Sequence, residues 1–277
     1  MINKRLFLHA MAAAPLGSWA ATAPAVLLAQ NAPKQIDVGR YLVSEKLDGV
    51  RAYWDGNLMF TRRGQPIALP AWFASHLPMR ALDGELWMAR GRFEATSAAV
   101  RRKKPLEAEW RALRYMVFEL PDAPGSFEQR AERLRGIAAE AAWDGLQAVV
   151  QTRVADAAEL QRRLVSVVQA GGEGLMLHEA DASYVTGRNA ALLKLKPQDD
   201  DEARVLAHLP GEGRLKGLLG ALRVRNAGGQ EFSIGSGFTD AQRRAPPAVG
   251  SWVTYRYRGL SSTGLPRFAT FLRVQEL

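Results

Sequence analysis

The sequence contains no cysteine among its 277 residues and only four histidines. The absence of cysteine excludes disulfide scaffolds, thiolate zinc sites, iron–sulfur clusters and a cysteine nucleophile. Four histidines leave little room for a histidine-rich metal centre. Acidic residues are outnumbered, with 28 Asp and Glu against 37 Lys and Arg and a formal net charge of +9. This balance favours an anionic partner, of which nucleic acid is the commonest.

The N-terminal segment carries positive charge only, since the first acidic residue is Asp37. Lys4 and Arg5 precede an apolar, alanine-rich stretch that prolines interrupt, which disfavours a membrane-spanning helix. Small residues that suit A-x-A cleavage stand at Ala21, Ala23 and Ala29. This pattern predicts an export signal over residues 1–29, and hence an exported mature protein with no membrane anchor.

Short apolar runs alternate with turn signals from residue 40 onward. They predict strands at residues 41–43, 51–54, 58–61, 81–88, 115–120, 174–178 and 192–196. Ser126 with Gln129, and Asp156 with Glu159, are typical of helix N-termini and predict two amphipathic helices. The mixture of strands and helices without a regular βαβ alternation indicates an α+β fold.

Composition changes at residues 197–202, where a proline, a glutamine and four acids predict a linker. Beyond it we expect only strands, at residues 203–208, 220–224, 231–235, 251–258 and 268–274. Five short strands with glycine-rich turns are typical of a small β-barrel of the oligonucleotide-binding (OB) type. The expected organisation is therefore an export signal at 1–29, a first domain at 30–198 and a barrel domain at 199–277.

Lys46 is the candidate nucleophile. It follows a predicted strand and precedes Asp48-Gly49, a turn pair that would hold its side chain in place. An attacking amine must be neutral, so its pKa must fall, and burial and neighbouring cations have that effect. Arg51, Lys194 and Lys196 could supply the positive field. Taken alone, the motif also fits an ordinary surface lysine in a hairpin.

Two carboxylates and two more lysines lie on apolar strands. Glu85 stands within one predicted strand and Glu173 at the start of another, while Lys194 and Lys196 alternate with leucines and so share a face. Carboxylates bind hard cations and lysines bind phosphoryl oxygens, so together these groups would form a magnesium and phosphate site. Each taken singly also fits a surface ion pair.

The order of the motifs resembles a known superfamily. The motifs are K-x-D-G at Lys46, T-R-x-G at residues 61–64, D-G-E at 83–85, an aromatic strand at 115–118, E-G-L-M at 173–176, L-K-L-K at 193–196 and a terminal segment at 264–273. They resemble those of the covalent nucleotidyltransferases, which comprise ATP-dependent DNA ligases, RNA ligases and mRNA capping enzymes. The short length and the export signal look most like the minimal, periplasmic-type bacterial DNA ligases. The resemblance implies a nucleotidyltransferase (ATP-grasp-like ligase) domain followed by an OB-fold domain.

The resemblance also implies roles for single residues. Lys46 would become bonded to AMP, and Lys194 and Lys196 would hold the α-phosphate and the bridging oxygens. The implied nucleotide contacts are Arg51 and Glu85 at the ribose, Phe118 stacked on adenine, and Arg267 and Arg273 at the leaving pyrophosphate. Ser44 and the backbone near Glu45 are candidates for reading adenine. Glu173 and Glu85 would bind the metal.

The expected partners are ATP, Mg or Mn, and nicked double-stranded DNA. We expect the protein to act as a monomer. The resemblance places Arg62 at the 5′-phosphate of the nick. The basic run that includes Arg101 and Arg102 would contact backbone phosphates, or else form a solvated face. One departure concerns Glu119, because the family motif carries Asp after the aromatic residue.

Two alternatives remain open from the sequence. The first keeps the catalytic fold with another substrate, as in an RNA ligase or a GTP-using capping-type enzyme. The second is a non-catalytic, exported DNA-binding protein with a degenerate fold. The intact set of Lys46, Glu85, Glu173, Lys194 and Lys196 argues against the second, because a binder does not need a lysine placed opposite two carboxylates.

Overall fold

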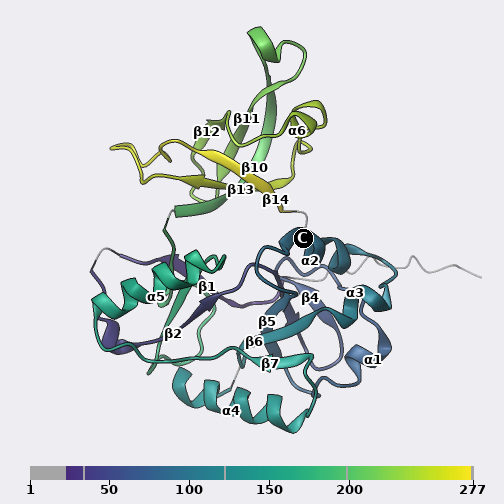
Figure 1. The fold of residues 1–277 in the computed structure, drawn as a ribbon, viewed down its shortest axis with the longest axis vertical. Helices are drawn as coiled ribbons and strands as arrows, with labels where there is room; N and C mark the ends of the chain where they lie inside the picture. Colours follow the sequence, from purple (N-terminus) through teal and green to yellow (C-terminus); the bar gives the residue numbers. More distant parts are fainter. Residues whose placement is uncertain (1–22, 34, 122, 198, 276–277) are drawn as a thin grey trace, which may run out of the picture.

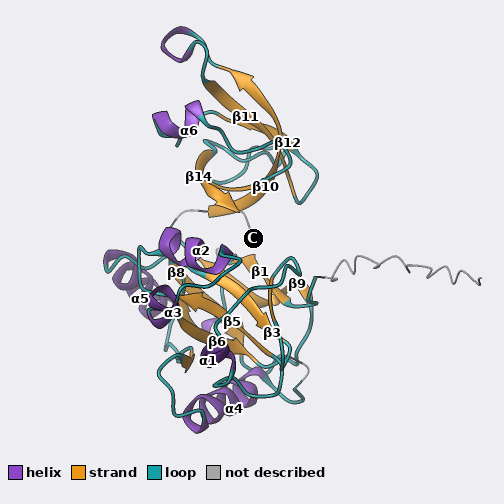
Figure 2. Ribbon diagram, turned by 90° about the vertical axis from the view of Figure 1, so that its right-hand side faces the viewer, coloured by secondary structure: helices purple, strands orange, loops and turns teal. Residues whose placement is uncertain are grey.

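The structure is a computed structural model that describes residues 23–33, 35–121, 123–197 and 199–275. The chain forms a larger N-terminal part and a smaller C-terminal part, which follow one another along the longest axis (Figure 1). The same separation is visible from the side (Figure 2). Strand β10 begins the C-terminal part.

The first sheet has four strands in the order β1-β9-β8-β2. Its strands are β1 (Leu27–Asn31), β2 (Tyr41–Lys46), β8 (Gly174–Glu179) and β9 (Gly187–Leu195). Strands β2 and β8 are antiparallel, with Lys46 opposite Gly174 and Ser44 opposite Met176. Because alternate side chains of a strand share a face, Ser44 and Lys46 project to the same side of this sheet.

The second sheet has five strands in the order β4-β3-β5-β6-β7. They are β3 (Val50–Trp54), β4 (Met59–Thr61), β5 (Leu82–Trp87), β6 (Arg114–Glu119) and β7 (Leu146–Ala148). The predicted hairpin of β3 and β4 is confirmed, and Asp55 closes its turn by accepting two backbone N–H groups. Strands β3 and β5 pair with Arg51 opposite Glu85. Gly84 is required between them and β6, since a Cβ there would lie 2.7 Å from the Met116 carbonyl oxygen.

Both predicted helices begin at their predicted caps. Helix α4 (Phe127–Glu140) has a capping box of Ser126 and Gln129, and the Asp156 side chain caps α5 (Ala157–Gln169). Leu134 of α4 belongs to the core of the second sheet, while the apolar face of α5 covers the first sheet. The shorter helices are α1 (Ala71–Ala74), α2 (Phe93–Arg101) and α3 (Glu107–Arg111), with a 3₁₀ turn η1 (Val38–Arg40).

The C-terminal part is one five-stranded sheet in the order β12-β11-β10-β13-β14. Its elements are β10 (Asp199–Pro210), η2 (Gly213–Leu215), β11 (Leu219–Asn226), β12 (Glu231–Ile234), α6 (Asp240–Arg244), β13 (Trp252–Tyr257) and β14 (Thr270–Gln275). Among the described residues the ladder does not close into a full barrel; a single bridge joins Ser236, after β12, to Thr270. Helix α6 corrects the expectation of strands alone, and its cap is Thr239 with Gln242.

The acidic run predicted as a linker is the start of β10. Asp199–Glu202 pair in antiparallel register with β13, Asp200 opposite Arg256 and Glu202 opposite Thr254. The linker interpretation of these acids is therefore wrong. The acids can lie in a sheet because cationic side chains of the N-terminal part compensate the charges of Asp200 and Glu202.

Strand β1 begins inside the segment predicted as an export signal. Leu27 is buried, and its carbonyl oxygen accepts a hydrogen bond of 2.8 Å from Arg51. Residues 27–29 thus belong to the folded domain, whereas the rest of the prediction up to residue 22 lies outside the described residues. Within the part of the chain that the structure describes, no helix has the length and apolar character needed to cross a membrane.

Candidate active site

A cavity of about 270 Å³ opens between the sheets, with walls from all three. It brings together most of the residues that the sequence singled out. Those that line it are Ser44, Glu45, Lys46, Arg51, Arg62, Glu85, Phe118, Glu173, Lys194, Lys196 and Arg273. Strand ends of the two N-terminal sheets therefore meet the first and last strands of the C-terminal part at one place.

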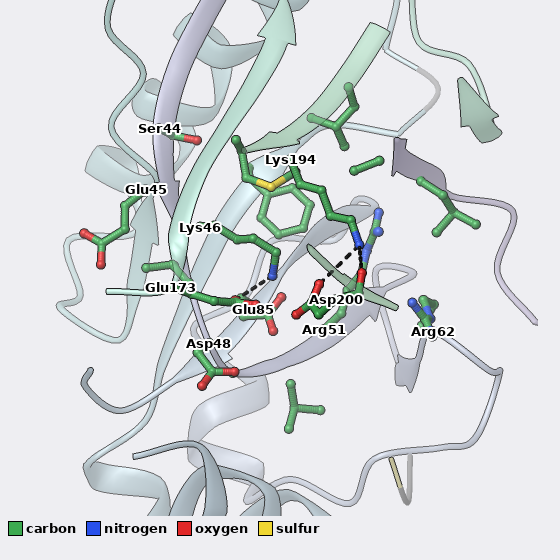
Figure 3. Close-up of a pocket in the computed structure, with 18 of the residues that line it drawn as sticks. Ser44, Glu45, Lys46, Asp48, Arg51, Arg62, Glu85, Glu173, Lys194 and Asp200 are labelled. Carbon is green, nitrogen blue, oxygen red and sulfur yellow. Dashed lines mark hydrogen bonds and ion pairs between the residues drawn. The ribbon is translucent and has the colours of Figure 1, made fainter. Parts of the chain in front are cut away.

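A chain of alternating charges forms the floor of the cavity, and Figure 3 shows two of its contacts, Lys46 with Glu173 and Lys194 with Asp200. The Lys46 ammonium lies 2.6 Å from Glu173 Oε2, and the other oxygen of Glu173 bonds Lys196. Lys196 also contacts Asp200, whose backbone oxygen accepts a bond of 3.0 Å from Lys194. Three ammonium groups and two carboxylates leave one net positive charge. The three ammonium groups can bind phosphoryl oxygens, provided that a ligand displaces them from Glu173 and Asp200.

The protonation state of Lys46 differs from the sequence-based expectation. Burial lowers the pKa of the Lys46 ammonium, but Glu173, Asp200 and Glu85 together raise that pKa above its ordinary value. The expectation of a lowered pKa is thus wrong for the ligand-free site, because contacting carboxylates outweigh the nearby cations. Lys196 behaves differently: burial and the neighbouring Lys46 lower its pKa.

The carboxylates of the cavity fall into two kinds. Burial alone would raise the pKa of Asp200, yet Lys196, Lys194 and Lys46 bring it down to about 2. By contrast, burial raises the pKa of Glu85 to about 8, because Lys46 and Arg51 compensate only part of the desolvation. Glu85 is therefore a carboxyl group that lacks a fully compensating cation.

The carboxylates fit a divalent cation that also binds a substrate phosphate. Among the described residues, no three His, Asp or Glu side chains form a preformed metal cluster. Mg²⁺, however, is usually held by one or two carboxylates together with substrate phosphates. Glu85, whose charged form is under-compensated, and Glu173 supply such a pair of oxygen ligands at the cavity.

Arg51 has a buried partner that the sequence reading did not assign. Its Nε donates to Asp83 Oδ1 at 2.9 Å, and Asp83 is fully buried. The guanidinium also lies 5.3 Å from the centre of the Phe118 ring. Asp83 is the first residue of the D-G-E motif, two positions before Glu85 on β5, so the two carboxylates share a strand face, and this spacing was the available signal. Asp83 fixes Arg51 against Phe118 on the cavity wall.

Glu119, the departure from the family motif, lines the cavity and forms a buried ion pair with Arg130. Arg130 of α4 donates to both of its oxygens, at 2.7 and 2.9 Å, and both side chains are almost completely buried. His178 stacks on Phe127. Burial lowers the pKa of this histidine well below its ordinary value, so it is neutral. The longer carboxylate thus has a partner on the neighbouring helix.

Contacts from the C-terminal part reach the cavity rim. Arg273 Nη1 lies 3.0 Å from Asp48 Oδ1, and its guanidinium carbon lies 3.9 Å from the centre of the Phe93 ring. Arg62 forms an ion pair with Glu202 at the start of β10. In this arrangement the terminal strand β14 therefore contributes a cation to the cavity.

Other predicted residues lie elsewhere. Arg267 packs over the exposed Phe268 ring and does not line the cavity. Arg101 and Arg102 lie at the end of α2, outside the cavity lining, and Arg102 pairs with Glu109. Glu45 belongs to the rim, but its carboxylate points away from Lys46 and pairs with Arg90 (Figure 3).

Two further cavity residues were missed by the sequence reading. Asp200 was assigned to a linker, although its place four residues after Lys196 in a strongly acidic run was a signal. Gln151 follows β7 and lines the cavity with a buried side-chain oxygen. Nothing in the local sequence distinguishes this glutamine from a surface one.

Comparisons with known proteins agree with the geometry. The family model described as the ATP dependent DNA ligase domain matches residues 27–196, and one described as a DNA ligase OB-like domain matches residues 210–275. A DNA ligase of Haemophilus influenzae is 39% identical over 233 residues, which cover 84% of this chain and 86% of that protein.

Solved structures show the same fold. A structure from a study of DNA binding with a minimal scaffold in Lig E DNA ligases has a TM-score of 0.64 and 43% identity, covering 91% of this chain and 99% of that one. A Chlorella virus DNA ligase-adenylate has a TM-score of 0.54 and 24% identity, covering 93% and 99%, which supports the fold alone. The family model and the relative from Haemophilus influenzae favour DNA ligase over the RNA ligase, capping-type and non-catalytic alternatives. With two family models and a relative matched over 86% of its length in agreement, the chain belongs to the ATP-dependent DNA ligases.

Proposed function

We propose that this DNA ligase seals nicks in duplex DNA through a covalent Lys46–AMP intermediate. The observation that carries the proposal is the position of the Lys46 ammonium inside the cavity, 2.6 Å from Glu173 and in one ionic chain with Lys196 and Lys194. The carboxylate beside this lysine controls its protonation, and the neighbouring ammonium groups can bind phosphates. A solvent-facing lysine would have neither.

The first step uses these residues in defined roles. The Lys46 nitrogen attacks the α-phosphorus of ATP; a P–N bond forms as the P–O bond to pyrophosphate breaks. Lys194 and Lys196 neutralise the phosphoryl oxygens once Asp200 and Glu173 release them, and Arg273 at the cavity rim is placed to meet the leaving pyrophosphate. In-line displacement at phosphorus depends mainly on such positioning and charge neutralisation.

Lys46 must lose its proton before it attacks. In the ligand-free site the adjacent carboxylates keep the ammonium charged. A divalent cation, Mg or Mn, held by Glu173 and Glu85 would neutralise those carboxylates and bind phosphoryl oxygens. The carboxylates that keep Lys46 protonated would therefore no longer raise its pKa once they bind the cation.

The later steps pass AMP to the 5′-phosphate of the nick and then join the 3′-hydroxyl to that phosphate with release of AMP. Arg62, at the cavity rim, is the proposed contact for the 5′-phosphate, and it must first separate from Glu202. Phe118 would stack on adenine, while Arg51 and Glu85, paired across β3 and β5, would hold the ribose. We assign Arg101 and Arg102 to the DNA backbone.

Labelling with ATP that carries the label on its α-phosphate tests the proposal. The wild-type protein is expected to acquire label, and Lys46→Ala to acquire none, because the variant lacks the amine that forms the bond to AMP while Lys194 and Lys196 remain in the cavity. Lys216→Ala, a change at an exposed lysine outside the cavity, is the matched control and should label normally. Retention of label by Lys46→Ala would falsify the assignment.

We further propose that the protein acts as a monomer in the periplasm after removal of an N-terminal signal. The basic and apolar N-terminal segment supports export. Cleavage is expected upstream of Leu27, at Ala23 rather than Ala29, because a cut after Ala29 would remove most of β1 and its bond to Arg51. N-terminal sequencing of the protein from a periplasmic extract decides this, and a start after Ala29 would contradict it.

A further inference from the structure

Arg63 connects the N-terminal part of the chain to the C-terminal part. It belongs to the turn after β4, in which Thr61 accepts hydrogen bonds from the backbone N–H groups of residues 63–65. The guanidinium carbon of Arg63 lies 5.0 Å from the centre of the Trp252 ring on β13. Its Nη1 donates to the backbone oxygen of Gln275 on β14 at 3.4 Å. One side chain of the N-terminal part thus contacts two neighbouring strands of the other part.

Trp252 lies on the same face of the C-terminal sheet as Arg273. Strands β13 and β14 pair with Trp252 opposite Gln275 and Thr254 opposite Arg273. Opposing residues share a face, as do alternate residues along one strand. Arg273 precedes Gln275 by two positions, which is roughly 7 Å along a strand. A side chain that holds Trp252 and Gln275 therefore also determines where Arg273 enters the cavity.

Arg62 and Arg63 have different surroundings although they are adjacent in the chain. Arg62 lines the cavity and donates to Glu202, whereas Arg63 is absent from the cavity lining and lies 3.9 Å from the same carboxylate. Burial lowers the pKa of the Arg63 guanidinium, because Glu202 compensates only part of the lost solvation. A partly desolvated cation gains most from the face of an indole ring. Arg63 therefore acts on the C-terminal part and not on a ligand of the cavity.

Arg273 reaches the cavity only while β14 lies against the N-terminal part. Its contacts at the rim are with Asp48 and Phe93, both of the N-terminal part, and its Nε is buried without a hydrogen-bond partner among the described residues. Arg63 supplies a contact between the two parts that lies outside the cavity. A nucleotide in the cavity therefore leaves this contact in place.

We propose that Arg63 is a positioning residue for the transfer of AMP from ATP to Lys46, since its contacts with Trp252 and Gln275 hold β14 where Arg273 enters the cavity. The inference rests on the proposed function, because it concerns the first step of that reaction. In the later steps Arg62 leaves Glu202 to meet the 5′-phosphate. Because Glu202 also lies beside Arg63, we expect the Arg63 contacts to open at that point, so the sealing of a pre-adenylated nick does not need them.

Separate measurements of two reactions test this role. The rate of AMP transfer from ATP to the protein and the rate of sealing a pre-adenylated nick are compared for the wild type, Arg63→Leu and Trp252→Leu. Each variant should slow AMP transfer by about three- to tenfold, the effect of losing a partly desolvated cation–π contact, while sealing stays within about twofold of the wild type. Trp252→Phe keeps an aromatic face and should stay within about twofold in both reactions.

Two further variants distinguish positioning from a general structural role. Arg111→Leu is the matched control, because this guanidinium lies 5.3 Å from the centre of the Trp72 ring within the N-terminal part and outside the cavity lining. It should leave both rates within about twofold of the wild type. Arg63→Leu made together with Arg273→Ala should slow AMP transfer by less than about twofold beyond Arg273→Ala alone, because the group to be positioned is missing. A structural role would give the same loss with and without Arg273.

The outcomes separate this inference from the proposed function. An unchanged rate of AMP transfer in Arg63→Leu, an equal slowing of both reactions, or a full further loss beside Arg273→Ala overturns the role of Arg63 and leaves the Lys46–AMP mechanism intact. A wild-type protein that takes no AMP from ATP overturns both. Thermal unfolding establishes which variants are folded, and Trp252→Leu carries the same test if Arg63→Leu does not fold.

Discussion

Replacing Arg130 by methionine removes the guanidinium that forms an ion pair with Glu119, a buried carboxylate in the wall of the active-site cavity. Arg130 is completely buried and Glu119 is 2% exposed. The guanidinium makes two bonds to Glu119 and donates to the carbonyl oxygens of Gly125 and Ala182, at 2.8 and 3.0 Å. Methionine fills much of the same volume but offers no donor. The variant would therefore leave Glu119 with a backbone N–H as its remaining close donor.

The size of the effect follows from the burial. Removing one partner of a buried ion pair costs roughly 3–5 kcal/mol, because the other charge remains desolvated. For a protein of this size each kcal/mol lowers the melting temperature by about 2–4 °C. We therefore expect Arg130→Met to lower the melting temperature by about 6–20 °C. The loss of stability should affect the N-terminal part, to which α4 and β6 belong.

Urea and thermal unfolding of the purified variants provide the assay. Arg133→Met, one turn along α4 and exposed, is the matched control and should lie within about 0.5 kcal/mol of the wild type. The double variant Arg130→Met with Glu119→Leu should recover part of the loss, because a buried ion pair can be replaced by apolar groups at little cost. The reasoning is refuted if the single variant loses less than about 1 kcal/mol, or if the double variant is less stable than the single one.

Two further predictions concern the cavity itself. Burial raises the pKa of Glu85 to about 8 from an ordinary 4.5, so the folded state binds this proton more tightly than the unfolded state. The stability that this provides is fully present below about pH 4.5 and is lost as the pH rises through about 8. Glu85→Gln, which does not titrate, should gain stability relative to wild type between about pH 5 and about pH 9 in urea unfolding, and a pH-independent difference would contradict the burial of this carboxyl. Arg273→Ala should reduce AMP transfer from ATP by tenfold or more, about the effect of losing one charged contact in a transition state, while the sealing of a pre-adenylated nick falls much less. The exposed Arg135→Ala on α4 is its control, and an equal loss in both reactions would sink the assignment of Arg273 to the first step.

Much of the molecule follows from local pattern. Helices α4 and α5 begin at their predicted caps because a side chain within three residues satisfies the first free N–H groups. The hairpin of β3 and β4 follows from its Asp55 turn. The spacing of K-x-D-G, D-G-E, E-G-L-M and L-K-L-K identified Lys46, Glu85, Glu173 and the two lysines that line the cavity. These features depend on residues that are close in the chain, so the periodicity of the sequence and the order of its motifs predict them.

The remaining features depend on pairs of residues that the chain brings together from a distance. Lys46 and Glu173 are 127 positions apart, and their contact is what raises the pKa that the sequence predicted to fall. Asp200 becomes part of the site only because β10 pairs with β13 and turns its acids toward the lysines. The partner of Glu119 and the unpaired oxygen of Gln151 likewise depend on which strand or helix packs alongside. The sequence determined which charged groups the site contains; tertiary packing decided their distances and burial, on which the Coulomb and desolvation energies depend.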